Sequence, residues 1–117
     1  MLYCNEAMSE ETQGYGVVLV TASSRSEAEM IARSLIEAKL AACITLFPMQ
    51  SIYAWQNEIQ QSEEWQLIIK SNLDRFSDLE AKICELHSYE VPEIIALPIV
   101  AGSQNYLHWI SQQVTPQ

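Results

Sequence analysis

The chain has 117 residues, of which 49% are apolar and 18% are charged, and its formal net charge is −9. This length suits one domain with a core large enough to fold without disulfides. The composition is that of a globular chain, and no apolar run approaches the roughly 20 residues that span a bilayer. The six Lys and Arg residues are scattered singly, so we expect neither nucleic acid nor a membrane as a partner.

Residues 1–14 have no sustained periodicity and end in "QGYG", which predicts a flexible N-terminal arm before a domain at 15–117. The acidic start lacks the basic and apolar regions of a signal peptide. The chain has three cysteines, an odd number without the regular spacing of a disulfide framework. Free cysteines of this kind are typical of proteins in a reducing compartment. We therefore expect a cytoplasmic protein.

Two periodicities alternate along the chain. Short apolar or alternating runs predict strands at 17–22, 43–48, 51–55, 59–71 and 94–100. Apolar residues at helical spacing predict helices over 23–42 and 72–87, and a short C-terminal helix after Ser103, which could cap it. Ser24 and Glu27 fit a capping box. Pro48 is predicted to end the second strand, and Pro98 indicates an edge strand or a bulge.

This order of elements predicts an α+β fold, a ferredoxin-like sandwich with both main helices on one face of the sheet. The two strands within 51–71 form a long β-hairpin that reaches beyond a sheet of this size. Because exposed strand edges and apolar faces invite association, we expect another subunit to cover this hairpin.

The segment "HSYEVPEIIALPIV", residues 87–100, places several polar groups directly before an apolar strand. One explanation is a metal site, since Cys84 and His87 form a C-x-x-H spacing. A closed metal cage would need a second pair of ligands, and the sequence has none, so such a cage is not predicted. Another is catalysis, yet Glu90 and Glu93 flank a proline with no fixed mutual geometry, and no nucleophile motif or phosphate-binding loop is present. No catalytic residue is predicted.

A third explanation is a ligand cleft. Its candidate residues combine aromatic rings with charges of both signs: Tyr53, Trp55, Glu64, Lys70, His87, Tyr89 and Glu93. Such a set suits a small anionic or zwitterionic molecule, with Lys70 as the cation. Aromatic residues are also enriched where subunits meet, so packing between subunits is the simpler explanation of Tyr53 and Trp55. Both explanations hold if the cleft lies between subunits.

Four blocks, "KLAACITLFP", "SIYAWQNEI", "LIIKS" and "LHSYEVPEIIALPIVAGSQNYLHWI", resemble the CutA family of divalent-cation tolerance proteins. The similarity runs from about residue 17 to residue 114 and leaves out only the arm and the last few residues. The resemblance implies a ferredoxin-like homotrimer, similar in architecture to the PII signalling proteins. It also implies a non-enzymatic role in tolerance of copper and other divalent cations, or alternatively a PII-like signalling role with a small-molecule effector between subunits.

The resemblance also suggests metal ligands. A histidine at the end of the second helix is a proposed copper ligand in some members, and His87 matches it. The cysteine proposed as its partner is replaced by Val20, a second histidine by Leu86, and the proline that usually follows the matched histidine by Ser88. We therefore expect weak binding of copper or another divalent cation that depends on His87, and no required cofactor.

Overall fold

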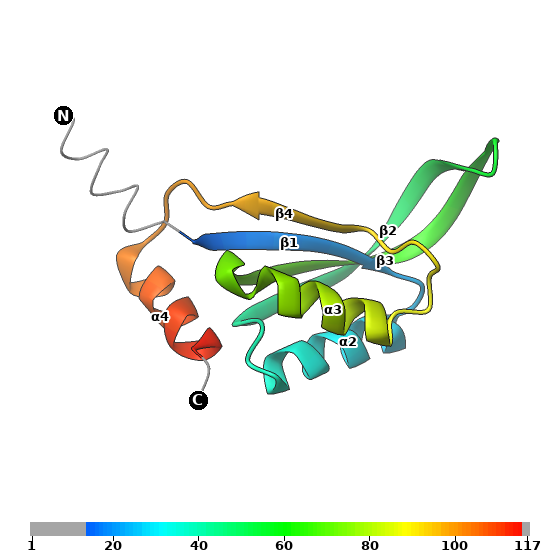
Figure 1. Ribbon diagram of the computed structural model, residues 1–117. Helices are drawn as coiled ribbons and strands as arrows, with labels where there is room; N and C mark the ends of the chain where they lie inside the picture. The colour runs from blue at the N-terminus through cyan, green and yellow to red at the C-terminus, as the bar shows by residue number, and fades with distance from the viewer. Residues whose placement is uncertain (1–13, 116–117) are drawn as a thin grey trace.

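The computed structural model describes residues 14–115, and most of the predicted arm, residues 1–13, lies outside this range. The elements follow in the order β1 (Tyr15–Ala22), α2 (Arg25–Glu37), β2 (Cys43–Trp55), β3 (Glu58–Asn72), a 3₁₀ turn (Leu73–Arg75), α3 (Phe76–Leu86), β4 (Ile94–Pro98) and α4 (Gln104–Val114). The strands form one antiparallel sheet in the order β2-β3-β1-β4. Figure 1 shows α2 and α3 together on one face of this sheet. The predicted α+β sandwich is thus confirmed.

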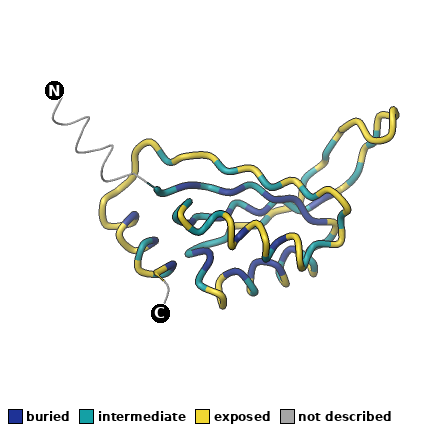
Figure 2. Tube along the Cα trace, viewed as in Figure 1, coloured by how far each residue is buried: buried dark blue, intermediate teal, exposed yellow. Residues whose placement is uncertain are grey.

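The core lies between the sheet and these two helices. Alternate residues of the central strands are fully buried against the helices, among them Val18 and Val20 of β1 and Leu67 and Ile69 of β3. The opposite face of the sheet has no helix over most of its length (Figure 1). Within the described residues, the sheet therefore has one covered face and one open face (Figure 2).

The start and end of α2 follow local rules. The Ser24 side chain accepts a hydrogen bond from the Glu27 amide, as predicted for an N-cap. The helix ends at Glu37, earlier than the predicted 42, because Lys39 adopts a left-handed conformation with φ of 59°. The amides of Lys39 and Leu40 donate to the carbonyls of Ile36 and Leu35, which is a Schellman motif.

Pro48 does not end its strand, so this prediction was wrong. β2 runs through it without a break, as part of one strand of 13 residues. Since β2 lies at the edge of the sheet, it has hydrogen-bonding partners on one side only, and a proline without an amide hydrogen is tolerated there. Two residues, Gln56 and Asn57, turn the chain into β3, and both have positive φ, as a tight hairpin requires.

The hairpin extends beyond the sheet. β1 pairs with β3 only as far as Trp65, so residues 49–64, here called the hairpin arm, contain two strands paired with each other alone. Figure 1 shows this arm projecting past the end of the sheet.

The last two elements differ slightly from their predictions. β4 ends at Pro98 and occupies the other edge of the sheet, which agrees with the edge position that Pro98 indicated. Ser103 occupies the N-cap position of α4, but its side chain makes no capping hydrogen bond. No helix within residues 14–115 is both long and apolar enough to cross a membrane.

Candidate functional site

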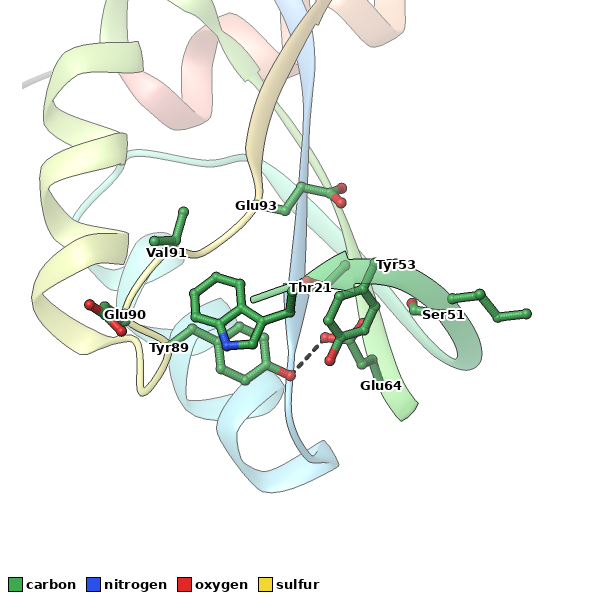
Figure 3. A pocket seen from close by; sticks show the side chains of 10 residues that line it. Thr21, Ser51, Tyr53, Glu64, Tyr89, Glu90, Val91 and Glu93 are labelled. Carbon is green, nitrogen blue, oxygen red and sulfur yellow. Dashed lines mark hydrogen bonds between the residues drawn. The ribbon is translucent and has the colours of Figure 1, made fainter. Parts of the chain in front are cut away.

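A cleft of about 490 Å³ opens between the hairpin arm and residues 87–93, the segment that joins α3 to β4 and is here called the α3–β4 segment (Figure 3). This volume is typical of small-molecule sites. The lining residues come from β1, the hairpin arm and the α3–β4 segment: Thr21, Ser51, Ile52, Tyr53, Trp55, Glu64, Tyr89, Glu90, Val91 and Glu93.

A hydrogen bond joins the two walls of the cleft. The Tyr89 hydroxyl donates to Oε2 of Glu64 at 2.7 Å (Figure 3). Burial raises the pKa of Tyr89, and the bond to the Glu64 carboxylate raises it further, so the phenol stays protonated and continues to donate at neutral pH. Glu64 itself is only 7% exposed, and no Lys, Arg or His within residues 14–115 forms an ion pair with it.

His87 supports this arrangement from behind the cleft. Its Nδ1 accepts a hydrogen bond from the Tyr89 amide at 3.0 Å, which places the ring proton on Nε2. Nε2 lies 2.6 Å from the Thr21 carbonyl oxygen and donates to it. The imidazole also packs against the Tyr89 ring, with centroids 4.7 Å apart. Both ring nitrogens are therefore engaged, and a metal could bind His87 only by replacing one of these bonds.

Glu27 ties the α3–β4 segment to the start of α2. Its Oε2 accepts from the Ser88 amide at 2.9 Å, and its Oε1 accepts from the amide and the hydroxyl of Ser23. Burial opposes the ionised carboxylate, but these hydrogen bonds outweigh it and lower the pKa of Glu27 to about 2. The sequence placed Glu27 in a capping box, whereas the contact with Ser88, 61 residues away, had no signal in the sequence.

The structure brings five of the predicted cleft residues together, namely Tyr53, Trp55, Glu64, Tyr89 and Glu93. His87 lies behind them and does not line the cleft. Thr21, Ser51 and Ile52 also line the cleft, although no sequence pattern points to them. Glu90 and Val91, which line it as well, are sequence neighbours of the predicted Tyr89 and Glu93.

Lys70 is not part of this group. Lys70 follows Glu64 by six residues on β3, and six residues of an extended strand span about 20 Å. Its Nζ lies 5.7 Å from the centre of the Tyr106 ring on α4 instead. Among the described residues, therefore, no Lys or Arg lines the cleft, whereas three carboxylates do.

The described part of the chain contains no group of three or more His, Cys, Asp or Glu side chains that could hold a metal ion. Cys43 lies opposite Lys70 in the sheet, and Cys84 is exposed on α3.

Comparison with known proteins gives a consistent result. The family model described as "CutA1 divalent ion tolerance protein" matches residues 16–113. The divalent-cation tolerance protein CutA of Thermus thermophilus is 42% identical over 97 residues, which cover 82% of this chain and 94% of that protein.

Solved structures agree. The periplasmic divalent cation tolerance protein CutA of Archaeoglobus fulgidus is 37% identical and superposes with a TM-score of 0.85 over 86% of this chain and 99% of that one. CutA1 of Oryza sativa is 35% identical, with a TM-score of 0.86 over 92% and 99% of the two chains. This chain belongs to the CutA1 divalent ion tolerance protein family.

Proposed function

We propose that this protein is a non-enzymatic, homotrimeric module that binds copper or another divalent cation weakly and acts in the response to metal ions. Its family and the names of its relatives support the role in divalent-cation tolerance. The observation that carries the proposal is the charge of the cleft, where Glu64, Glu90 and Glu93 face no Lys or Arg among the described residues. Carboxylate oxygens bind divalent cations, and an acidic cleft concentrates them.

Weak affinity follows from how the ligands are arranged. Copper prefers imidazole and thiolate ligands. The histidine beside the cleft, His87, uses both ring nitrogens within the fold, so a metal must displace the Tyr89 amide or the Thr21 carbonyl to reach it. Breaking either hydrogen bond costs free energy, and this cost lowers the affinity of the site for the metal.

Calorimetric titration of Cu²⁺ and Zn²⁺ tests this proposal. We expect copper affinity weaker than micromolar, a further loss in His87→Ala and in Glu64→Gln, and no change in Cys43→Ala. Stoichiometric binding with submicromolar affinity, or loss of binding in Cys43→Ala alone, would contradict it. Circular dichroism of each variant controls for folding, since His87 also supports the α3–β4 segment.

The open face of the sheet supports the homotrimer. This face carries Val17 and Leu19 of β1, Ile68 of β3, and Ile95 and Leu97 of β4, and the last two are nearly half exposed. The hairpin arm adds Ile52 at 70% and Ile59 at 85% exposure. Contiguous apolar surface of this kind marks a subunit interface.

Light scattering should give roughly 40 kDa for three chains of 13.3 kDa, and a stable monomer at micromolar concentration would refute the assembly.

A second candidate function is the binding of a small-molecule effector, as in PII-like signalling proteins. The observation that favours it is the size of the cleft, about 490 Å³, together with its aromatic residues Tyr53, Trp55 and Tyr89. A metal ion alone would leave most of this volume unused.

For either function we propose the cytoplasm as the compartment, because the cysteine content suits reducing conditions.

A further inference from the structure

The cleft has apolar aromatic walls on both sides. Tyr53 and Trp55 project from the hairpin arm, and Tyr89 projects from the α3–β4 segment. Figure 3 shows the Tyr89 hydroxyl directed at the Glu64 carboxylate, to which it donates a hydrogen bond. The faces of such rings are electron-rich and attract organic cations, particularly alkylated ammonium groups.

The charge at the base of the cleft is negative and unbalanced. Glu64 is 7% exposed, and its carboxylate accepts one hydrogen bond, from the neutral Tyr89 hydroxyl, within the part of the chain that the structure describes. A buried carboxylate without a cationic partner is costly, because the protein has removed it from water without supplying an opposite charge. A bound cation would supply that charge.

The rim of the cleft also favours a cation as the ligand. Glu90 and Glu93 are exposed beside the opening, and the chain as a whole carries a net charge of −9. An anionic ligand would meet repulsion from all three carboxylates. A neutral ligand would cover Glu64 further and leave its charge uncompensated.

We propose that the cleft binds a small organic cation, with an ammonium group at Glu64 and its alkyl substituents against Tyr53, Trp55 and Tyr89. This assignment rests on the second candidate function above and names the chemical class of its ligand. It reverses the charge preference expected from the sequence, because Lys70, the residue expected to hold an anion, lies elsewhere on β3.

Three probes of matched size test the charge of the ligand on the full-length wild-type protein. Choline carries a quaternary ammonium, neohexyl alcohol is its neutral isostere with carbon in place of nitrogen, and tert-butylacetate is an anion of similar shape. Titration calorimetry or ligand-observed NMR should give millimolar binding of choline, and binding at least about tenfold weaker for the other two. Equal binding of choline and neohexyl alcohol, preference for the anion, or no binding of any probe would overturn the proposal.

Two carboxylate variants then locate the site. Glu64→Gln keeps an acceptor for Tyr89 but removes the charge, and should weaken choline binding about tenfold. Glu80→Gln makes the same chemical change at an exposed position of α3 and should leave choline affinity within about twofold. An equal loss in both variants would show a general effect of net charge and would overturn the site. If Glu64→Gln fails to fold, Trp55→Leu tests the aromatic wall in its place, with the same expected loss for choline.

The same samples separate this proposal from metal binding. Titration of Cu²⁺ in parallel reports the metal function independently. Copper binding without choline binding overturns the present proposal alone. Choline binding without copper binding supports it and refutes the metal-binding part of the proposed function.

Discussion

Replacing Glu27 with glutamine would remove a negative charge at the junction of α2 with the α3–β4 segment. The carboxylate accepts three hydrogen bonds there, two from Ser23 and one from the Ser88 amide. Glutamine offers a single oxygen acceptor, so it can retain the bonds to Ser23 or the bond to Ser88 but not both sets at full strength. We expect the variant to fold with a weakened attachment of the α3–β4 segment.

The magnitude follows from the pKa. A decrease in pKa from 4.5 to about 2 corresponds to roughly 3 kcal/mol of preferential stabilisation of the ionised form in the folded state. Because Glu27 is only half-buried, solvent screening reduces this figure, and we expect a loss of about 1–2 kcal/mol in the free energy of unfolding at neutral pH.

The pH dependence has a definite sign. The pKa of Glu27 is lower in the folded state than in the unfolded state, so its contribution is complete above about pH 4.5 and is lost as the pH falls towards 2. The difference in unfolding free energy between wild type and Glu27→Gln should therefore be largest at neutral pH and more than half lost near pH 3.

Urea denaturation at one fixed protein concentration would measure this difference, since assembly also contributes to stability. Glu29→Gln is the matched control, because Glu29 pairs with the exposed Arg25 on the outer side of the same helix and should cost less than about 0.5 kcal/mol. Equal losses in the two variants, or a loss in Glu27→Gln that does not diminish in acid, would refute the anchoring role of Glu27.

Three further predictions concern the packing of the sheet, the buried carboxylate of the cleft and the subunit interface. In Gly16→Ala the new methyl group would lie 2.5 Å from the Leu73 side chain, so urea denaturation should show a loss of about 1–3 kcal/mol, more than in Gly102→Ala, where the nearest contact is 3.1 Å. Tyr89→Phe leaves the buried Glu64 carboxylate without its donor and should cost about 1–3 kcal/mol, whereas Tyr53→Phe loses only a bond to Ser62 near the surface and should cost less than Tyr89→Phe in the same assay. Leu97→Lys on the open sheet face should lower the molar mass measured by light scattering, whereas Ile36→Lys on α2, which is similarly exposed, should leave it unchanged.

Local patterns in the sequence were sufficient to predict which residues form the core between the sheet and the helices. The apolar residues at helical spacing include Ile31 and Leu79, and the alternation within residues 59–71 puts Leu67 and Ile69 on one strand face. All four are fully buried. Such patterns depend only on which side of an element faces its neighbour, and the backbone geometry of helices and strands determines that directly.

Features that depend on the position of an element in the sheet were harder to predict. Pro48 is compatible with a strand because β2 is an edge, and edge position is a property of the assembled sheet. Lys70 is the cation of the predicted cleft set, and the sequence pattern does not give its distance from Glu64. Because β3 is one continuous strand, six residues separate the two side chains by about 20 Å, and Lys70 does not line the cleft.

The anchoring of the α3–β4 segment explains why a cleft can exist beside an irregular stretch of chain. Residues 87–93 lack regular structure, yet three consecutive residues hold the start of this segment in place: His87 bonds to the Thr21 carbonyl, the Ser88 amide to Glu27, and the Tyr89 hydroxyl to Glu64. Each bond reaches a different element, β1, α2 and β3 respectively. A segment ordered in this way before binding loses little conformational freedom when a ligand arrives. If the cleft binds a ligand as proposed, His87 and Glu27 would influence its affinity through the position of Tyr89, although neither side chain lines the cleft.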